Sequence, residues 1–245
     1  MQIKINSLSK RFANKNVLDD VSLTANSDDI ICIVGANGSG KSTLIKILAT
    51  LYNPNSGSVF LDNINVIDNP NQFRKVLGYL PQDVPIYPHL TATEFLNYIS
   101  AIKGLSAKQA NEQINKWLEL FNLEQYKKQQ LFSYSGGMRR RIGIVCALLG
   151  NPKIILLDEP NSGLDLEERI NLRNILKEIS KDRIILMATH ITSDINAIGS
   201  CLVILSDGKI NFKGIPSELI ARTNTLTLEE AYLNFTAVDG NQVIF

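Results

Sequence analysis

The 245-residue sequence has almost no excess charge and no long apolar run. Its 25 lysines and arginines nearly balance 24 aspartates and glutamates, so the net charge is +1. Because no general positive field exists, we expect neither nucleic acid nor an anionic membrane surface to be drawn to it. No stretch approaches the roughly 20 apolar residues that span a bilayer, and the start lacks the apolar core of a secretory signal. We therefore expect a cytoplasmic chain that forms no pore by itself.

Cysteine is scarce as well. Cys32, Cys146 and Cys201 each lie in an apolar run, they are odd in number, and they do not have metal-ligand spacing. These features indicate buried free thiols in a reducing compartment. The sequence also lacks internal repeats, linkers and low-complexity tracts. Its length suits one large domain or two small ones.

Short apolar runs alternate with helical patterns along the chain. The runs predict strands at 3–5, 21–25, 30–34, 76–80 and 154–158 and from 183 onward. Hairpins are predicted at 57–66, turning at Asp62-Asn63, and at 201–214, turning at Asp207-Gly208. Helical patterns occur at 44–51, from 92 to 146, at 166–179, and near Pro216 and Glu229.

This alternation predicts an α/β fold with a parallel sheet covered on both faces. The early hairpins add a small antiparallel β-subdomain, and the helical block in the middle indicates an inserted helical subdomain. We expect a single domain over 1–245. Residues 1–82 and 147–245 would form its core together with the β-subdomain, and residues 83–146 would form the helical subdomain.

The segment "GANGSGKST" follows the buried run "IICIV" and precedes a helical pattern. This is the context of a G-x-x-x-x-G-K-[ST] loop, whose backbone N–H groups bind phosphate oxygens. Lys41 would reach the β- and γ-phosphates, and the Ser42 hydroxyl would bind Mg²⁺. A glycine-rich turn with an incidental lysine is the structural alternative. The candidate nucleotide-binding residues are Gly35, Asn37, Gly38, Ser39, Gly40, Lys41, Ser42 and Thr43.

A second candidate segment, "IILLDEP", places Asp158 and Glu159 after a buried strand. Ligands of open α/β sheets bind at the carboxyl ends of the strands. Asp158 there can hold Mg²⁺ directly or through water, and Glu159 can polarise an attacking water. Alone, this pattern is equally compatible with an acidic turn. Together with the glycine loop, it favours a site for nucleotide hydrolysis.

The stretch "YSGGMRRR" supplies a second candidate phosphate site. Ser135 can cap a helix whose first turn, Gly136-Gly137, has no side chains to block an anion. One phosphate site already exists at the glycine loop. The economical interpretation is that this second site serves a nucleotide held by another copy of the chain.

In order and spacing these motifs resemble those of the nucleotide-binding domain of ABC transporters, over nearly the whole chain. "GANGSGKST" is similar to the Walker A motif, "LPQD" to the Q-loop with Gln82, "YSGGM" to the signature, "IILLDEP" to Walker B and "SGLD" to the D-loop. Tyr134 and Met138 depart from the consensus signature LSGGQ. The resemblance implies a P-loop NTPase (RecA-like) core that binds ATP and Mg²⁺.

The resemblance also implies individual roles. Phe12 would stack on adenine, Gln82 would contact Mg²⁺ and water, and His190 would contact the γ-phosphate. Two cassettes, most simply identical, would enclose ATP head to tail. Separate transmembrane permease subunits would hold the cassette on the cytoplasmic face of the membrane. The signature and the C-terminal "LEEAYLNFT" look most like bacterial exporters of drugs, peptides or antibiotics.

Two other functions are weighed against a transporter ATPase. A soluble ABC ATPase in cofactor assembly would use the same motifs, whereas the long heptad arms of DNA-repair ATPases are absent. A non-hydrolysing regulatory cassette is disfavoured because Lys41, Asp158, Glu159 and His190 are all present.

Three further interpretations concern the helical region. Arg139, Arg140 and Arg141 are expected on a solvated helix face. Trp117 and its apolar neighbours are expected in the core. Ile86 and Tyr87 are expected to face outward, where membrane partners dock in the family.

Overall fold

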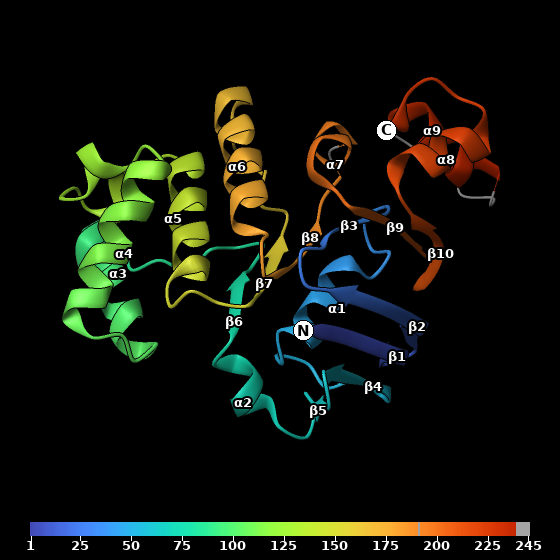
Figure 1. The fold of residues 1–245 in the computed structure, drawn as a ribbon, viewed down its shortest axis with the longest axis horizontal. Helices are drawn as coiled ribbons and strands as arrows, with labels where there is room; N and C mark the ends of the chain where they lie inside the picture. Colours follow the sequence, from blue (N-terminus) through green and yellow to red (C-terminus); the bar gives the residue numbers. More distant parts are fainter. Residues whose placement is uncertain (191, 239–245) are drawn as a thin grey trace.

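The computed structural model describes residues 1–190 and 192–238, with the backbone alone for 192–194 and 238. Its centre is a six-stranded sheet in the order β10-β9-β3-β8-β7-β6 (Figure 1). All neighbouring strands run parallel except the β9–β10 hairpin, which turns at Asp207-Gly208 as predicted. The bounds are β3 Ile30–Val34, β6 Leu77–Leu80, β7 Ile154–Asp158, β8 Ile184–Ala188, β9 Cys201–Ser206 and β10 Lys209–Gly214.

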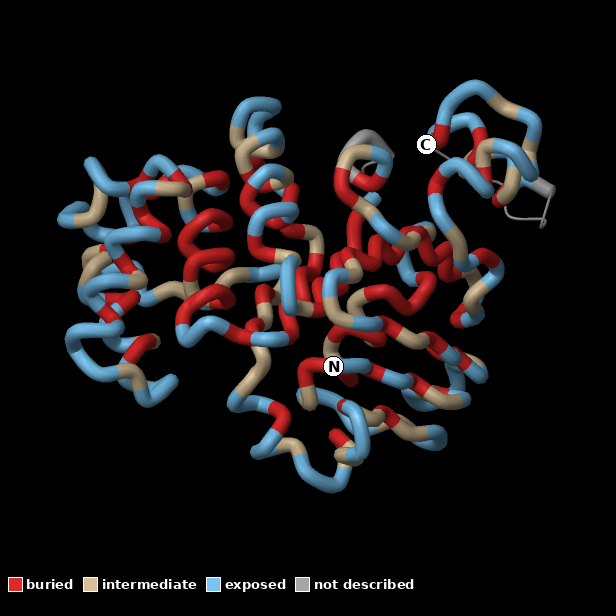
Figure 2. The backbone as a smooth tube through the Cα atoms, in the orientation of Figure 1, coloured by how far each residue is buried: buried red, intermediate tan, exposed pale blue. Residues whose placement is uncertain are grey.

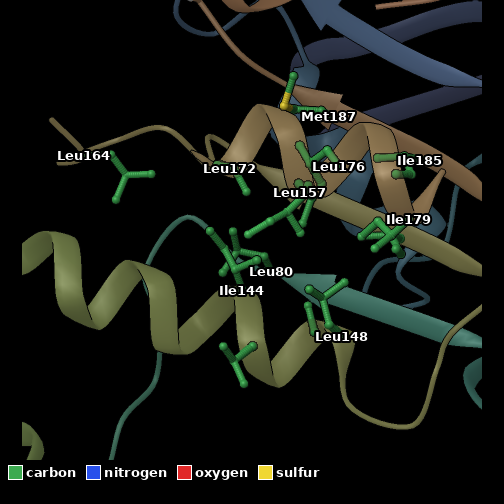
Figure 3. Packing of buried hydrophobic residues seen from close by; sticks show 14 of the residues in the cluster. Leu80, Ile144, Leu148, Leu157, Leu164, Leu172, Leu176, Ile179, Ile185 and Met187 are labelled. Carbon is green, nitrogen blue, oxygen red and sulfur yellow. The ribbon is translucent and has the colours of Figure 1, made fainter. Parts of the chain in front are cut away.

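Both faces of this sheet are buried, because alternate residues of each central strand enter two different hydrophobic clusters. In β3, Cys32 belongs to the cluster on the helical side, whereas Ile31 and Ile33 belong to the cluster that also contains the buried apolar residues of α1 (Lys41–Leu48). Figure 3 shows part of the first cluster, where Ile144 and Leu148 lie beside Leu80 and Leu157. The predicted α/β class with a parallel sheet covered on both faces is confirmed.

A second, antiparallel sheet has the order β2-β1-β4-β5. Its strands are β1 Gln2–Phe12, β2 Lys15–Asn26, β4 Ser56–Leu61 and β5 Ile64–Asn65. The predicted strand at 3–5 lies near the start of β1, and the one at 21–25 lies near the end of β2. The two strands pair from Gln2↔Asn26 to Phe12↔Lys15. The predicted turn at Asp62-Asn63 joins β4 to β5.

The helices cover the central sheet and extend beyond it on one side (Figure 1). Two short helices, α2 and α7, were not predicted from the sequence. The bounds are α1 Lys41–Leu48, α2 Pro70–Arg74, α3 Ala92–Ile102, α4 Ala107–Leu120, α5 Gly136–Leu148, α6 Leu166–Ile179, α7 Thr192–Ile198, α8 Pro216–Thr223 and α9 Leu228–Val238, with 3₁₀ turns η1 Glu124–Tyr126 and η2 Leu131–Ser133.

The helical block predicted from 92 to 146 consists of three helices. A short loop joins α3 to α4, and a longer segment with the turns η1 and η2 joins α4 to α5. Capping boxes at Thr91 and Ser106 begin α3 and α4. Trp117 is buried, as predicted, and only 8% of it is exposed. α5 contacts both α3 and α4 on one side and β6 and β7 on the other. The predicted subdomain boundary at residue 146 therefore falls within α5.

The arginine prediction is wrong for two of the three residues. Arg139 is exposed, but Arg140 and Arg141 are buried, with exposed fractions of 4% and 9%. Their guanidinium groups donate hydrogen bonds to backbone carbonyls of other segments of the chain. Figure 2 shows that much of α5 is coloured as buried.

Two apolar residues also differ from expectation. Leu51, counted with the buried helix face at 44–51, is 57% exposed because α1 ends at Leu48. Ile86 is half-buried against the helical cluster, whereas Tyr87 is exposed as expected. Among the described residues, none of the helices combines the length and the apolar character needed to cross a membrane.

Candidate nucleotide-binding site

The glycine loop connects the carboxyl end of β3 to the start of α1. Gly40 is the N-cap of α1 and has φ 110°, a conformation that side-chain-bearing residues rarely adopt. A Cβ atom there would lie 2.6 Å from the Val17 carbonyl oxygen. Because no side chain caps α1, the first N–H groups of the helix stay available to an anion.

A cavity of about 300 Å³ opens over this loop. Gln82 and Glu159 reach it from segments that follow β6 and β7. A second cavity of about 340 Å³ lies beside it, between the glycine loop, which includes Ser39, and the β9–β10 turn. The first cavity is lined by Lys15, Val17, Asn37, Gly38, Gly40, Lys41, Ser42, Thr43, Gln82 and Glu159.

Lys41 is buried at the start of α1, and 7% of it is exposed. Its Nζ donates to the carbonyls of Gly35 at 2.7 Å and Ala36 at 3.0 Å. Burial lowers the pKa of this ammonium, and the nearby carboxylates of Glu159 and Asp158 oppose that shift. The structure thus places a desolvated cation among the loop carbonyls, beside the helix N-terminus.

Asp158 ends β7 and is fully buried. Its Oδ1 accepts a hydrogen bond from Ser42 Oγ at 3.0 Å, while Oδ2 has no partner among the described residues. Burial is the main cause that raises the pKa of this carboxyl group, although the Ser42 hydrogen bond opposes it. A buried carboxylate oxygen without a partner is costly, so this pair suits a hard divalent cation.

Glu159 follows Asp158 and lines the cavity. Its Oε2 lies 2.7 Å from Nδ1 of His190. Glu159 has φ 56°, in the left-handed region, and its N–H donates to the Ala188 carbonyl at 2.9 Å. Unusual backbone conformations of this kind concentrate at functional sites. The structure therefore brings these two predicted residues together at the sheet edge.

Phe12 is the one nucleotide-binding candidate from the N-terminal strands, and it does not line either cavity. It ends β1, opposite Lys15, which lines both. Its ring meets the edge of Tyr52 with centroids 5.5 Å apart, and Lys10 Nζ lies 4.9 Å from the ring centre. Phe12 is 41% exposed, so the ring retains a free surface.

Ser135, Gly136 and Gly137 begin α5 and do not line the glycine-loop cavity. Ser135 Oγ accepts from the Met138 N–H at 3.1 Å, which is the predicted cap. A Cβ at Gly137 would lie 2.9 Å from the Gly163 carbonyl, so the helix start lies directly against the "SGLD" segment. By contrast, nothing lies within 4 Å of a Cβ at Gly136. This helix N-terminus is open on one side.

Some cavity residues were missed from the sequence. Lys15 and Val17 line the first cavity, and Asp207 lines the second. They come from the two hairpins that flank the glycine loop, so only the fold reveals them.

A parallel sheet, a glycine loop between β3 and α1, and a buried aspartate at the end of β7 define a P-loop nucleotide hydrolase. Among known families, the model named "ABC transporter" matches residues 18–162, more than half of the chain. The protein therefore belongs to the ABC transporter family as an ATP-binding cassette.

Named relatives agree with this assignment. The chain is 35% identical over 228 residues to the uncharacterized ABC transporter ATP-binding protein YxlF of Bacillus subtilis (strain 168), covering 92% of this chain and 76% of that protein. Other relatives are much longer. ABC transporter A family member 8 of Dictyostelium discoideum is 35% identical over 211 residues, which cover 83% of this chain but 25% of that protein.

Solved structures share the fold, and one of them is a post-hydrolysis state. One, titled as the ATP binding subunit of an ABC transporter, superimposes with a TM-score of 0.88 at 28% identity and covers 96% of this chain and 100% of its own. The dimeric ATP-binding cassette MJ0796, in a post-hydrolysis state with ADP and Pi, has a TM-score of 0.80 at 26% identity and covers 87% and 98%. The present chain is accordingly an ABC ATPase.

Proposed function

We propose that this chain is the ATP-hydrolysing subunit of an exporter whose membrane-spanning subunits are separate polypeptides. The observation that carries the catalytic part is the Glu159–His190 pair, 2.7 Å apart, at the edge of a cavity shared with Lys41, Ser42 and Gln82. This arrangement offers a general base, its orienting partner and a phosphate cradle in one place.

Each residue has a distinct proposed role. The α1 N-terminus and Lys41 hold the phosphates, and electrostatic stabilisation by such groups is the main source of rate in phosphoryl transfer. Glu159 aligns or activates water, and His190 contacts the γ-phosphate. Phe12 stacks on adenine once its ring turns from Tyr52 toward Lys15.

Mg²⁺ is the proposed metal, with Ser42, Asp158 and Gln82 as its protein contacts. Within the described part of the chain, no group of three His, Cys, Asp or Glu residues could hold a metal ion, so the remaining ligands would be nucleotide oxygens and water. When bound, the ion neutralises charge on the β- and γ-phosphates. The free Asp158 Oδ2 supports this assignment.

The second half of the site comes, in this proposal, from another copy of the chain, most simply in a homodimer. Ser135, Gly136 and Gly137 would contact the γ-phosphate of the nucleotide held by the partner. The open surface at Gly136 supports this role, because an approaching phosphate meets no neighbouring atom there. Residues 83–146 are proposed to act as a helical subdomain that carries this surface.

A mostly apolar groove of about 510 Å³ supports docking to a membrane partner on the cytoplasmic face. It lies between the segment after Gln82 and helices α3 and α5, and it includes Val84, Pro85 and Ile99. Tyr87, beside it, is 53% exposed and packs against Tyr98. Drugs, peptides or antibiotic-like molecules are the proposed cargo, by resemblance of the signature and the C-terminal segment.

The transport part is tested by purifying the protein from its native cells in mild detergent and identifying its partners by mass spectrometry. A polytopic membrane protein in near-equal amount is expected. A soluble scaffold in its place, without a membrane protein, would leave the ATPase assignment intact and support the alternative of a non-transport machine such as cofactor assembly.

The catalytic part is tested with Glu159→Gln. Because the amide cannot accept the proton of water, we expect ATP hydrolysis to fall by about 100-fold or more while ATP still binds. ATP should then accumulate in a stable dimer, measured by gel filtration with and without nucleotide. An unimpaired turnover rate in this variant would show that Glu159 is not the group that activates water.

A further inference from the structure

Arg140 is a buried cation in α5 that no part of the proposed mechanism uses. Its Nη1 donates to the carbonyls of Pro81 at 2.8 Å and Gln82 at 2.6 Å, and its Nη2 donates to the Asp158 carbonyl. Only 4% of the residue is exposed. One guanidinium therefore joins three segments: the start of α5, the loop after β6 and the end of β7.

The contact with Asp158 acts on the peptide that links Asp158 to Glu159. Its carbonyl accepts from Arg140, and its N–H, which belongs to Glu159, donates to the Ala188 carbonyl at 2.9 Å. Both ends of this peptide plane are thus fixed. Glu159 adopts φ 56°, a conformation that needs support from its surroundings. Arg140 supplies part of that support and so helps to set where the Glu159 carboxylate points.

The contacts with Pro81 and Gln82 likewise fix the backbone on the other wall of the glycine-loop cavity. Gln82 and Glu159 both line that cavity, from different strands. Their side chains reach the cavity, whereas Arg140 binds only backbone oxygens of both segments. The guanidinium fork suits this task, because its fixed donors hold several acceptors in one geometry.

We infer that Arg140 is a positioning residue that holds Gln82 and Glu159 in register with the start of α5. This inference rests on the proposed roles of those two residues. Ser135 is the N-cap of the same helix, five residues before Arg140. A shift of this helix would therefore pull on the backbone of both cavity walls through the Arg140 hydrogen bonds. Contact of Ser135–Gly137 with one nucleotide would in this way adjust the hydrolytic groups of the chain's own site.

The test replaces the guanidinium by an apolar side chain of similar length, Arg140→Met, in the full-length protein. Misplacement of reacting groups by an ångström costs about 100-fold in rate, so we expect kcat to fall by about 10- to 100-fold. The ATP dissociation constant, measured with a fluorescent nucleotide, should change by less than about threefold, because Arg140 does not contact the glycine loop. Arg140→Lys should recover part of the rate.

Arg183 provides the matched control. It also donates to backbone carbonyls, those of Pro152 and Ile179, but it precedes β8 and lies at the opposite edge of the sheet. Arg183→Met should lower the unfolding temperature at least as much as Arg140→Met and should leave kcat unchanged. Amide hydrogen exchange at Glu159 should become faster in Arg140→Met and not in Arg183→Met.

Three results would overturn the inference: an unchanged kcat in Arg140→Met, an equal loss of kcat in Arg183→Met, or unchanged protection of the Glu159 amide. If Arg140→Met does not fold, Arg140→Lys is judged by the same three measurements. These outcomes are separate from those of Glu159→Gln. Wild-type turnover in that variant would remove the proposed role of Glu159, whereas the amide exchange result would still report on the Arg140 contact.

Discussion

Two helices of this protein begin at glycines, and their beginnings differ in what surrounds them. α1 starts after Gly40 inside a cavity, with Lys41, Glu159 and Gln82 around it. α5 starts after Ser135 at the surface, and no atom lies within 4 Å of a Cβ placed on Gly136. Both ends present free N–H groups and a positive partial charge.

The difference shows that a helix N-terminus by itself does not make a nucleotide site. At α1 the chain adds a cation, Lys41, a buried carboxylate, Asp158, and cavity walls that include Gln82 and Glu159. At α5 the chain adds a side-chain cap and leaves the outer side open. In the proposed dimer, the first end would bind nucleotide within one copy, whereas the second end would contact a phosphate that is brought by the partner.

The largest effect is expected from a side chain that obstructs the N-terminus of α1. In Gly40→Ala, the new Cβ would lie 2.6 Å from the Val17 carbonyl, at a φ of 110° that alanine resists. We expect a loss of about 2 kcal/mol or more in unfolding free energy and no detectable ATP binding. Thermal unfolding and titration with a fluorescent nucleotide measure the two effects.

Gly38→Ala is the control for backbone strain alone. Gly38 has φ 81°, yet nothing lies within 4 Å of its Cβ position. Gly38→Ala should lower the unfolding free energy less than Gly40→Ala does, because it adds backbone strain but no steric conflict with Val17. Wild-type ATP affinity in Gly40→Ala would contradict the close approach that the structure shows at this loop.

A smaller effect is expected from a charged side chain at the N-terminus of α5. Gly136→Glu places a carboxylate in the first turn of α5, where a negative charge favours the helix. The isolated cassette should therefore fold and bind ATP normally. The carboxylate would meet the partner's phosphates in the dimer, so we expect ATP hydrolysis to fall by about 100-fold.

Gly136→Ala is its control, since a methyl group adds little bulk and no charge at this open position. It should retain most of the activity. The measurement is steady-state hydrolysis together with ATP-dependent dimer formation by gel filtration. If Gly136→Glu hydrolyses ATP at the wild-type rate, then the α5 end does not meet a nucleotide in the active dimer.

Sequence patterns were sufficient for the parts of the fold and site that depend on neighbouring residues. The helix at 166–179 was predicted to the residue. The structure shows a local signal at its start, where Asp165 and Glu168 form a capping box. The loop at 35–43 and the buried strand before Asp158 are likewise local signals. Their apolar runs and glycine positions need no information from elsewhere in the chain.

Arg140 and Arg141 could not be placed by the same reasoning. Their partners are carbonyls 18 to 59 residues away, including Asp158 for Arg140 and Phe121 for Arg141. A charged triplet predicts a solvated face unless such acceptors are known. Lys15 and Asp207 were missed for a related reason: each reaches a cavity only because its hairpin folds beside the glycine loop.

The smallest expected effect separates two roles of Ser135. Its Oγ accepts from the Met138 N–H at 3.1 Å, so Ser135→Ala should cost about 1 kcal/mol of unfolding free energy. For a chain of this size, that loss lowers the unfolding temperature by about 2–4 °C. Ser106 caps α4 in the same way, with Oγ 3.3 Å from the Gln109 amide nitrogen, and it lies away from the cavities.

Ser106→Ala therefore shows what a lost cap alone does. If both variants lose similar stability and only Ser135→Ala loses ATP hydrolysis, Ser135 contacts the nucleotide in addition to capping its helix. Equal hydrolysis rates in the two variants would mean that the α5 end acts through its backbone N–H groups alone. The contrast between α1 and α5 would then rest on what surrounds each helix end rather than on the residue that caps it.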